Sequence, residues 1–521
     1  MSADLVLLDG KVITMNPKQA TADAVAIKNG KIIQVGSKET VRKTIVKGTK
    51  IISLKGKTVI PGIIDTHIHV ADFGRILSWL NLEGVGSIKE LQDSLNQRVK
   101  ETSKGKWIIG RGWNENSLGE KRFPTCFDLD KVSPDNPVVL YHASGQICVV
   151  NSRATELAGI TQQIGSGIGK NQAGQLTGIL RDEATNIVWN VIPAPDEEEL
   201  VAATTLAFTK IVEAGITSIH WLILSPMEIA VIRKLNEQRK FSITVNVIAP
   251  ANLFDEISKL SLKQSSSNEN LQFSGFEIFA DGYLAARTAA LSEPYSDCLN
   301  EKGKLLCPQE EMAKTAAKIT EAGFQLVIHA VGDKAVDAAL NIIENRNATT
   351  RSKVRCRIEQ GAVLNKKLIE RLSEQHVVVS VQPRVVASEF SVWSAVDRLG
   401  SKRARWLFPL KTLVESGIRV VAGSDCPMEP LNPLLGIQDA VTREMYPEER
   451  VSVEEALRMY TVNGAYASFE ENIKGSIEVG KIADITVLSS DPQTVQPDKI
   501  SAITVEMTIL GGQVINTKIS S

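Results

Sequence analysis

Alternating apolar and polar positions mark the first sixty residues, in the segments 5–15, 24–35 and 50–60. The pairs Asp9-Gly10 and Asn29-Gly30 interrupt two of these segments. Such pairs favour two-residue hairpin turns, because the turn needs positive φ at its centre. The pattern therefore predicts a small β module at the N-terminus.

From Pro61 onward the pattern changes to short apolar, β-branched runs that alternate with long helical patterns. The runs are TSIHWLI, ITVNVIA, GFEIFADG, FQLVIHAVGD, RCRIEQG, VVVSVQP and IRVVAGSD. Apolar strands that alternate with helices indicate a parallel sheet covered on both faces, and seven or eight such units indicate a (β/α)8 barrel. Glycine precedes three of the runs, where it fits the residue that follows the end of a helix.

Two segments do not fit this alternation. The stretch 72–195 contains Gly-rich and Pro-rich phrases instead of one βα unit, which predicts an insertion at the catalytic end of the barrel. After about residue 474 the chain returns to strand patterns. We therefore expect an α/β protein with a barrel over 61–474, a cap insertion at about 72–195, and a β-sandwich assembled from 1–60 and 475–521.

Composition and charge exclude several classes of protein. The 521 residues include 59 Lys and Arg against 60 Asp and Glu, so the chain has no long-range field that would attract nucleic acid or an anionic membrane. No window reaches the roughly 18 apolar residues of a membrane span. The six cysteines form no C-x-x-C pair, which argues against a disulfide framework and a thiolate zinc site. We expect a cytoplasmic protein that acts on a small molecule, with a homodimer as the candidate assembly.

The strongest chemical motif is VIPGIIDTHIHV, which contains His67 and His69. Alternate residues of a strand share a face, so this pair directs two imidazoles to one point, a spacing suited to a divalent metal. His329 and Asp425 each close a later apolar run. Because the C-terminal ends of barrel strands converge on one mouth, these four side chains form a plausible metal site. The alternatives are a packed core imidazole for His329 and a helix N-cap for Asp425.

The chain resembles the amidohydrolase superfamily at this point, and within it the amidohydrolase family 3 (YtcJ-like) branch, which includes N-substituted formamide deformylases. The resemblance rests on VIPGIIDTHIHV, DGYLAARTAALSEPYSD, QLVIHAVGDKAVDAAL, VVAGSDCPMEPLNPLLGIQDAVTRE and GSIEVGKIADITVL, and it runs from about residue 5 to 514. It implies a metal-dependent hydrolase on a (β/α)8 barrel with an appended β-sandwich and a cap insertion.

Three positions depart from the pattern of that family. Glu277 stands where a metal-bridging carboxylated lysine is usual, Gln360 where a metal-binding His is usual, and Gln146 where the insertion usually carries a His. The changes at Glu277 and Gln360 both concern a second metal. A mononuclear site is therefore favoured, with two metals as the alternative, and His329 and Glu277 are the candidates that would complete the one or two sites.

Five positions are candidates for substrate binding. His220 follows an apolar run and Trp113 lies in the insertion, while Arg287 matches a family position near the substrate. Gln146 and Gln360 replace family histidines and belong to the same group. A structural His, burial under the insertion and an ion pair at the barrel rim are the respective alternatives for His220, Trp113 and Arg287.

The sequence thus predicts hydrolysis of a non-peptide C–N bond in an amide, formamide or cyclic amide. Zinc is the favoured ion, and Asp425 is the expected general base and then general acid. Two alternatives stay open. One is a mononuclear aminohydrolase that deaminates a heterocycle, and the other is a metal-free binding protein that has lost catalysis.

Overall fold

The computed structural model describes every residue except 162–165, 239, 259–269, 350–353 and 519–521. It contains two compact units. The first comprises Met1–Asp72 together with Ala207–Ser521, and the second comprises Phe73–Leu206. Among the described residues, no helix is both long enough and apolar enough to cross a membrane.

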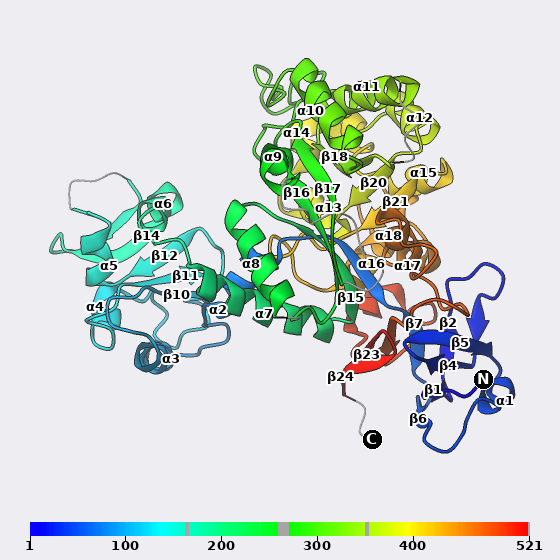
Figure 1. Ribbon diagram of the computed structural model, residues 1–521. Helices are drawn as coiled ribbons and strands as arrows, with labels where there is room; N and C mark the ends of the chain where they lie inside the picture. Colours follow the sequence, from blue (N-terminus) through cyan, green and yellow to red (C-terminus); the bar gives the residue numbers. More distant parts are fainter. Residues whose placement is uncertain (162–165, 239, 259–269, 350–353, 519–521) are drawn as a thin grey trace. The chain divides into compact units, whose positions relative to one another are not determined.

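Eight parallel strands form the sheet at the centre of the first unit (Figure 1). The strands are buried along almost their whole length, as the unbroken apolar runs predicted, and they pair with the next strand along the chain. They are β8 (Ile63–Ile68), β15 (Ile216–Leu222), β16 (Thr244–Pro250), β17 (Leu271–Phe279), β18 (Gln325–Ala330), β19 (Arg357–Gln360), β20 (Val378–Val381) and β21 (Arg419–Ala422). The predicted fold class, a (β/α)8-type barrel with additional sheets, is confirmed.

The barrel closes between its first and last strands. No ladder joins β8 to β21 along their length, but an isolated bridge pairs Ile68 with Cys426. Beside it, the Asp425 amide donates to the His67 carbonyl at 2.8 Å and the His69 amide donates to the Cys426 carbonyl at 2.9 Å. The closure therefore lies in the segments that carry the His-x-His motif and Asp425.

Helices alternate with the barrel strands. Gly215, Gly323 and Gly417 each follow a helix with φ between 76° and 84°, the left-handed conformation expected of them. The helices of this unit are α1 (Lys38–Arg42), α8 (Pro226–Glu237), α9 (Phe254–Ile257), α10 (Gln309–Glu321), α11 (Asp333–Thr349), α12 (Lys366–Glu374), α13 (Pro383–Ser391), α14 (Ala395–Ala404), α15 (Leu410–Glu415), α16 (Pro433–Thr442), α17 (Val453–Met459) and α18 (Val462–Ala467). Two others, α2 (Val70–Ser78) and α7 (Glu197–Glu213), run across the boundaries between the units.

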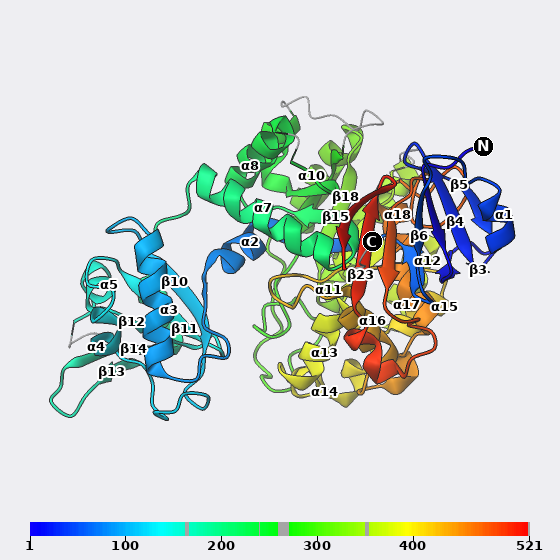
Figure 2. The same ribbon diagram turned by 90° about the horizontal axis from the view of Figure 1, so that it is seen from below.

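Strands from both ends of the chain share one sheet, seen in Figures 1 and 2 where the C-terminal strands lie beside N-terminal ones. Its order is β24 (Gln513–Thr517), β23 (Val505–Leu510), β22 (Ile485–Leu488), β7 (Thr58–Pro61), β2 (Lys11–Ile13) and β3 (Thr21–Ala22). A second sheet contains β5 (Lys31–Gly36), β4 (Ala24–Lys28), β1 (Leu5–Leu8) and β6 (Lys50–Ser53). One hydrophobic cluster contains residues of both sheets, so both termini contribute to a common core.

The second unit has a six-stranded sheet and hydrophobic clusters of its own. The sheet order is β13 (Ile168–Lys170), β14 (Leu176–Arg181), β12 (Ile147–Val150), β11 (Val138–His142), β10 (Ile108–Trp113) and β9 (Leu80–Asn81). Its helices include α3 (Ile88–Glu101), α4 (Cys126–Asp130), α5 (Ser152–Leu157) and α6 (Thr185–Trp189). The chain enters this unit after β8 and returns to the barrel at β15.

Candidate metal centre

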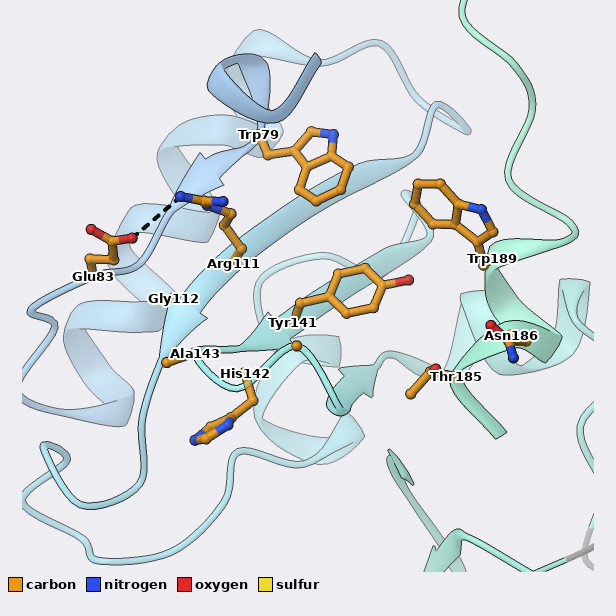
Figure 3. A pocket seen from close by; sticks show the side chains of 11 residues that line it. Trp79, Glu83, Arg111, Gly112, Tyr141, His142, Ala143, Thr185, Asn186 and Trp189 are labelled. Atoms are coloured by element: carbon orange, nitrogen blue, oxygen red, sulfur yellow. Dashed lines mark ion pairs between the residues drawn. The ribbon is translucent and has the colours of Figure 1, made fainter. Parts of the chain in front are cut away.

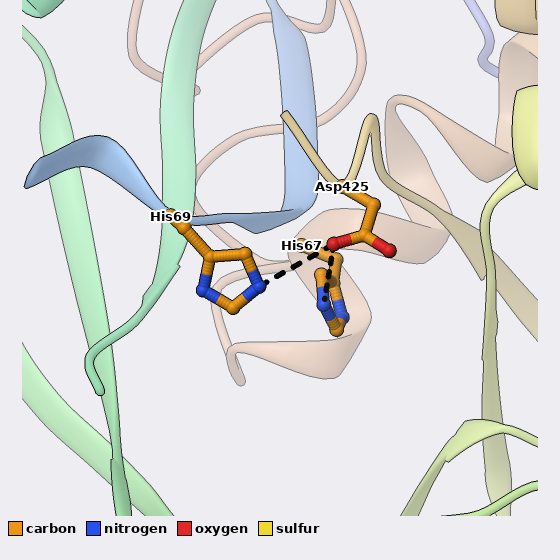
Figure 4. A group of neighbouring side chains, drawn as sticks. All are labelled: His67, His69 and Asp425. Atoms are coloured by element: carbon orange, nitrogen blue, oxygen red, sulfur yellow. Dashed lines mark ion pairs between the residues drawn. The ribbon is translucent and has the colours of Figure 1, made fainter. Parts of the chain in front are cut away.

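Three side chains from the two ends of the barrel sequence meet where β8 and β21 close the sheet (Figure 4). The Nε2 atoms of His67 and His69 lie 3.4 and 3.3 Å from Oδ1 of Asp425, and the three residues each offer a ligand atom within 4.8 Å of those of the other two. Asp425 has a left-handed backbone with φ of 58°, a conformation that Asp tolerates better than most residues. The loop after β21 thereby turns a carboxylate toward both imidazoles.

Hydrogen bonds fix the proton on the other nitrogen of each ring. Nδ1 of His69 lies 3.0 Å from the carbonyl oxygen of Leu222, which can only accept, so this Nδ1 must donate. Nδ1 of His67 lies 2.8 Å from a carboxylate oxygen of Glu359. In the neutral form both rings therefore present the lone pair of Nε2 toward Oδ1 of Asp425.

Three electron-pair donors directed at one region require a cation or added protons between them. Burial by itself lowers the pKa of His67, but the carboxylates of Asp425 and Glu359 raise it well above its ordinary value. Burial likewise opposes ionisation of Asp425, yet the two imidazoles hold its pKa far below the usual range. Two imidazole nitrogens and one carboxylate oxygen are a donor set that suits zinc and similar divalent ions. These residues fit a divalent metal.

Glu359 holds His67 in place, and the sequence analysis did not identify it. Both Glu359 and Arg357 are fully buried on β19 and form an ion pair through Nε of Arg357. Nη2 of Arg357 also donates to the carbonyl of Thr66 at 2.6 Å, one residue before His67. A carboxylate that accepts from the second nitrogen of a metal-binding His fixes its tautomer and ring orientation. The R-x-E spacing on a predicted strand, which places both side chains on one face, was the available signal.

His220 has its Nδ1 in this same buried network. Nη1 of Arg357 donates to that nitrogen at 2.7 Å, which requires an unprotonated Nδ1. Burial, and then the charge of Arg357, lowers the pKa of His220 well below its ordinary value. His220 is not among the residues that line the cavity described next, so its position favours the structural role that was the alternative to substrate binding.

A cavity of about 550 Å³ lies over the three-residue cluster. Its polar lining includes His67, His69 and Asp425 and also three other candidates from the sequence, namely Glu277, His329 and Gln360. The rest of the lining is largely apolar, with Leu222, Leu224, Phe279, Tyr283, Leu284, Val331, Val385, Trp393, Phe408 and Met428 among its members. The site thus combines a polar floor with an apolar wall.

Glu277, His329 and Gln360 stand outside the three-residue cluster although they share its cavity. Burial raises the pKa of Glu277 to about 7, with a further contribution from Glu359, and within the described part of the chain its buried Oε1 has no hydrogen-bond partner. Burial lowers the pKa of His329 to about 4, so its ring is neutral near pH 7. Gln360 has a left-handed backbone with φ of 69°. Uncommon backbone conformations of this kind concentrate at functional sites.

Arg287 does not line the cavity. Its Nη2 lies 2.7 Å from Oδ2 of Asp297, and both side chains are partly exposed. This arrangement is the ion pair that was the alternative to a substrate clamp. Arg398 approaches the same carboxylate at 3.5 Å, so Asp297 already balances two cations.

The remaining candidates, Trp113 and Gln146, belong to the second unit. Trp113 is wholly buried in a hydrophobic cluster and donates from Nε1 to the carbonyl of Leu140 at 2.8 Å, which leaves its ring no surface for a ligand. Its position favours packing over a place in the pocket wall. Gln146 is exposed in the loop between β11 and β12.

The second unit has a cavity of its own, of about 510 Å³ (Figure 3). Trp79, Tyr141 and Trp189 line it, and the rings of Trp79 and Tyr141 stack with centroids 6.0 Å apart. Arg111 and Glu83 face each other at 3.5 Å at its edge. The sequence analysis did not identify this aromatic cluster, because its members come from distant segments with no common motif.

Comparisons with known proteins find relatives along nearly the whole chain. The family model described as "Amidohydrolase family" matches residues 50–516. The Bacillus subtilis protein YtcJ is 32% identical, covering 98% of both chains, and the N-substituted formamide deformylase of Arthrobacter pascens is 26% identical over 98% of this chain and 97% of its own.

Solved structures show the same fold. An uncharacterised metal-dependent hydrolase from Pyrococcus furiosus superposes with a TM-score of 0.77 at 29% identity, covering 94% of this chain and all of the other. The atrazine chlorohydrolase of Arthrobacter aurescens, solved with zinc, superposes with a TM-score of 0.56 at 13% identity over 98% of this chain and 95% of its own, a likeness of fold alone.

Proposed function

Because this chain belongs to the amidohydrolase family, a family with metal-dependent hydrolases among its members, we propose that it hydrolyses a non-peptide C–N bond. The substrate is an amide, formamide or cyclic amide with an apolar substituent. The observation that carries the proposal is the convergence of Nε2 of His67, Nε2 of His69 and Oδ1 of Asp425 at the floor of an apolar cavity.

His67, His69 and Asp425 would hold one divalent ion, with zinc favoured because two imidazoles and a carboxylate match its preferences. When bound, such an ion polarises a carbonyl group and makes water more acidic. Glu277 and His329 share the cavity and are the residues that would complete the coordination. Gln360 offers only a neutral amide, which is a weak ligand, so one ion is favoured over two.

Asp425 is the proposed proton carrier. Oδ1 faces both imidazoles, and Figure 4 shows the second carboxylate oxygen directed away from the rings. That oxygen is available to take a proton from attacking water and to pass it to the leaving nitrogen, as general base and then general acid. His67 is held by Glu359, and His69 by the carbonyl of Leu222, so the two rings keep their orientation during this transfer.

The apolar cavity wall supports a substrate with an apolar body next to the reacting group. Leu222, Phe279, Val331, Phe408 and Met428 contribute to it from separate elements. The resemblance to an N-substituted formamide deformylase makes N-alkyl and N-aryl formamides the first compounds to test.

The proposal is tested by elemental analysis of the purified protein and by an assay of formate and amine release from a panel of N-substituted formamides. We expect about one equivalent of bound ion. His67→Asn should lose the ion and lower kcat/KM at least about 100-fold, since an amide replaces an imidazole ligand. His376→Asn is the matched control, because His376 is exposed with φ of 51°, a conformation that Asn accepts, and it lies before β20.

Two outcomes would contradict the proposal. A protein that holds no divalent ion and gains no activity when ions are added would be a binding protein. Release of ammonia from a heterocyclic amine without formate release would identify an aminohydrolase instead. Gln360→His tests the number of ions separately, since we expect the imidazole to raise metal content toward two equivalents.

A further inference from the structure

Glu389 is a buried carboxylate in the wall of the cavity over the metal centre, and the proposed reaction does not use it. The residue lies on α13 and is 7% exposed. Its Oε2 is buried and has no hydrogen-bond partner among the described residues. A buried polar atom without a partner destabilises the folded state, and more so when it is charged. A ligand in the cavity is the natural source of the missing donor.

The helix directs Glu389 to the cavity together with apolar neighbours. Val385 and Trp393 stand four residues before and after it, and all three line the cavity. Residues spaced by four share one face of a helix, so Val385 and Glu389 point the same way on α13, and Trp393 follows the end of the helix. Phe408, Phe279 and Tyr283 contribute further aromatic rings to the same cavity. The carboxylate therefore interrupts a wall that is otherwise apolar and aromatic.

Neither lysine nor arginine is among the described residues that line this cavity, whereas four carboxylates are: Asp72, Glu277, Glu389 and Asp425. Asp425 belongs to the metal cluster, and Glu277 is the further candidate ligand. The positive charge that acts on Glu389 is Arg398, and Nη1 of Arg398 lies 3.5 Å from Oδ2 of Asp297. Burial raises the pKa of Glu389 to about 7 despite Arg398, so the protein does not supply a full counter-charge.

We propose that Glu389 is a specificity-determining residue that binds a positively charged nitrogen of the substrate. The substrate class is then an amide or formamide whose N-substituent carries an ammonium or amidinium group on an apolar body. The rings of Trp393 and Phe408 favour the same group, because aromatic faces attract cations. This inference rests on the proposed hydrolysis only for the reacting end of the substrate, since recognition by Glu389 concerns the other end.

Binding is tested with the holoenzyme by calorimetry, using 4-phenylbutylammonium and its neutral analogue 4-phenylbutan-1-ol. We expect the wild type to bind the cation at least about 10-fold more tightly, the range of a charge-assisted hydrogen bond. The preference should persist after chelation, which excludes coordination of the amine to a metal. Glu389→Gln keeps the shape of the side chain and removes its charge, so it should abolish the preference and leave the binding of the alcohol unchanged.

Glu429→Gln is the matched control. Glu429 is also 7% exposed, but it is already paired with Ser388 and Arg384 and does not line the cavity. The Glu429→Gln variant should therefore bind the cation more tightly than the alcohol, as the wild type does. An equal affinity of the wild type for both compounds, or a preference that survives in Glu389→Gln, would overturn the inference.

A kinetic comparison separates this inference from the proposed function. N-(4-aminobutyl)formamide and N-pentylformamide have the same reacting group and differ in the terminal charge. We expect the cation to have the lower KM with similar kcat in the wild type, and Glu389→Gln to remove the difference in KM. Hydrolysis of both at equal KM would leave the proposed function intact and refute the role of Glu389. Absence of any hydrolysis, with the binding preference retained, would refute the function alone.

Discussion

At the scale of single residues, the candidate metal centre depends on the groups that accept a hydrogen bond from Nδ1 of each imidazole. Glu359 accepts from His67 and the Leu222 carbonyl accepts from His69, so each ring directs its second nitrogen toward Asp425. Glu359 is itself compensated by Arg357, with which it forms a fully buried pair. The orientation of the buried His67 ring is thus determined by charges inside the barrel.

Glu359→Gln is predicted to weaken metal binding about 10- to 100-fold, because the amide is a poorer acceptor for Nδ1 of His67. It should also lower the free energy of unfolding by about 3–5 kcal/mol, since it leaves Arg357 buried without a carboxylate. Metal affinity is measured by competition with a chromophoric chelator, on the folded protein. Glu449→Gln is the control, because this buried carboxylate accepts from Thr412, in a contact that involves none of the candidate metal ligands. Unchanged affinity in Glu359→Gln would refute the positioning role.

Glu389 gives a prediction for stability against pH. Its pKa is about 7 in the folded chain, against about 4.3 for an unperturbed Glu. Between these values the folded state binds more protons than the unfolded state, so this residue lowers stability as pH rises through that window. Glu389→Gln should therefore increase the free energy of unfolding at pH 8 by at most about 4 kcal/mol and have little effect near pH 4.5. Thermal unfolding at both pH values measures this, and a variant that is less stable at pH 8 would contradict it.

At the scale of elements, the site exists because the first and last barrel strands approach each other at one point. Asp65 accepts there from the backbone amides of His67 and Ser424, at 3.1 and 2.9 Å, and so joins the two segments. Gly423 lies within the same contact. A Cβ added at Gly423 would lie 2.4 Å from the backbone nitrogen of His67 and 2.5 Å from the Cβ of His67. The close approach that forms the metal cluster leaves no room for a side chain.

Gly423→Ala is predicted to displace His67 and to weaken metal binding at least about 10-fold, because backbone atoms must shift to relieve the contact. Gly86→Ala is the control, since the added Cβ would meet only the Glu90 carboxylate, at 3.5 Å. Metal content after dialysis against a defined free-ion concentration distinguishes the two variants. Full retention of the ion by Gly423→Ala would show that the closure is more tolerant than its geometry indicates.

At the scale of the whole molecule, the two ends of the chain build one core next to the barrel. Ile485 of β22 pairs with Pro61 of β7, and the chain continues through Gly62 into β8, which carries the His-x-His motif. The Gly62 amide donates to the carbonyl of Asp484 at 2.8 Å. The C-terminal strands therefore support the first strand of the barrel.

Ile485→Ala is predicted to lower the free energy of unfolding by about 2–5 kcal/mol, the cost of removing a fully buried aliphatic side chain. Ile51→Ala, at a position in the same β module that is 51% exposed, should change it by no more than about 0.5 kcal/mol. Denaturant titration monitored by tryptophan fluorescence measures both. A similar small effect for both variants would mean that the C-terminal strands contribute little to stability.

The sequence by itself determined the features that repeat with a local period. Unbroken apolar runs between helical patterns specified the barrel, and the glycines after helices specified where strands begin. The His-x-His spacing placed two imidazoles on one strand face, because residues two apart in a strand point the same way. These features could be read from short windows, since each depends on neighbours in the chain.

Only the tertiary structure decided which distant groups meet. Glu359 is 292 residues from His67 in the chain, and no local pattern pairs them. The same holds for His220, which accepts a hydrogen bond from Arg357 and is not among the residues that line the cavity. It also holds for Trp113, which is buried in a hydrophobic core. Glu389 was missed because a lone Glu on a helix carries no signal until its burial without a partner is visible. Burial and long-range contacts depend on how elements pack together, and the periodicity of a single element does not encode that.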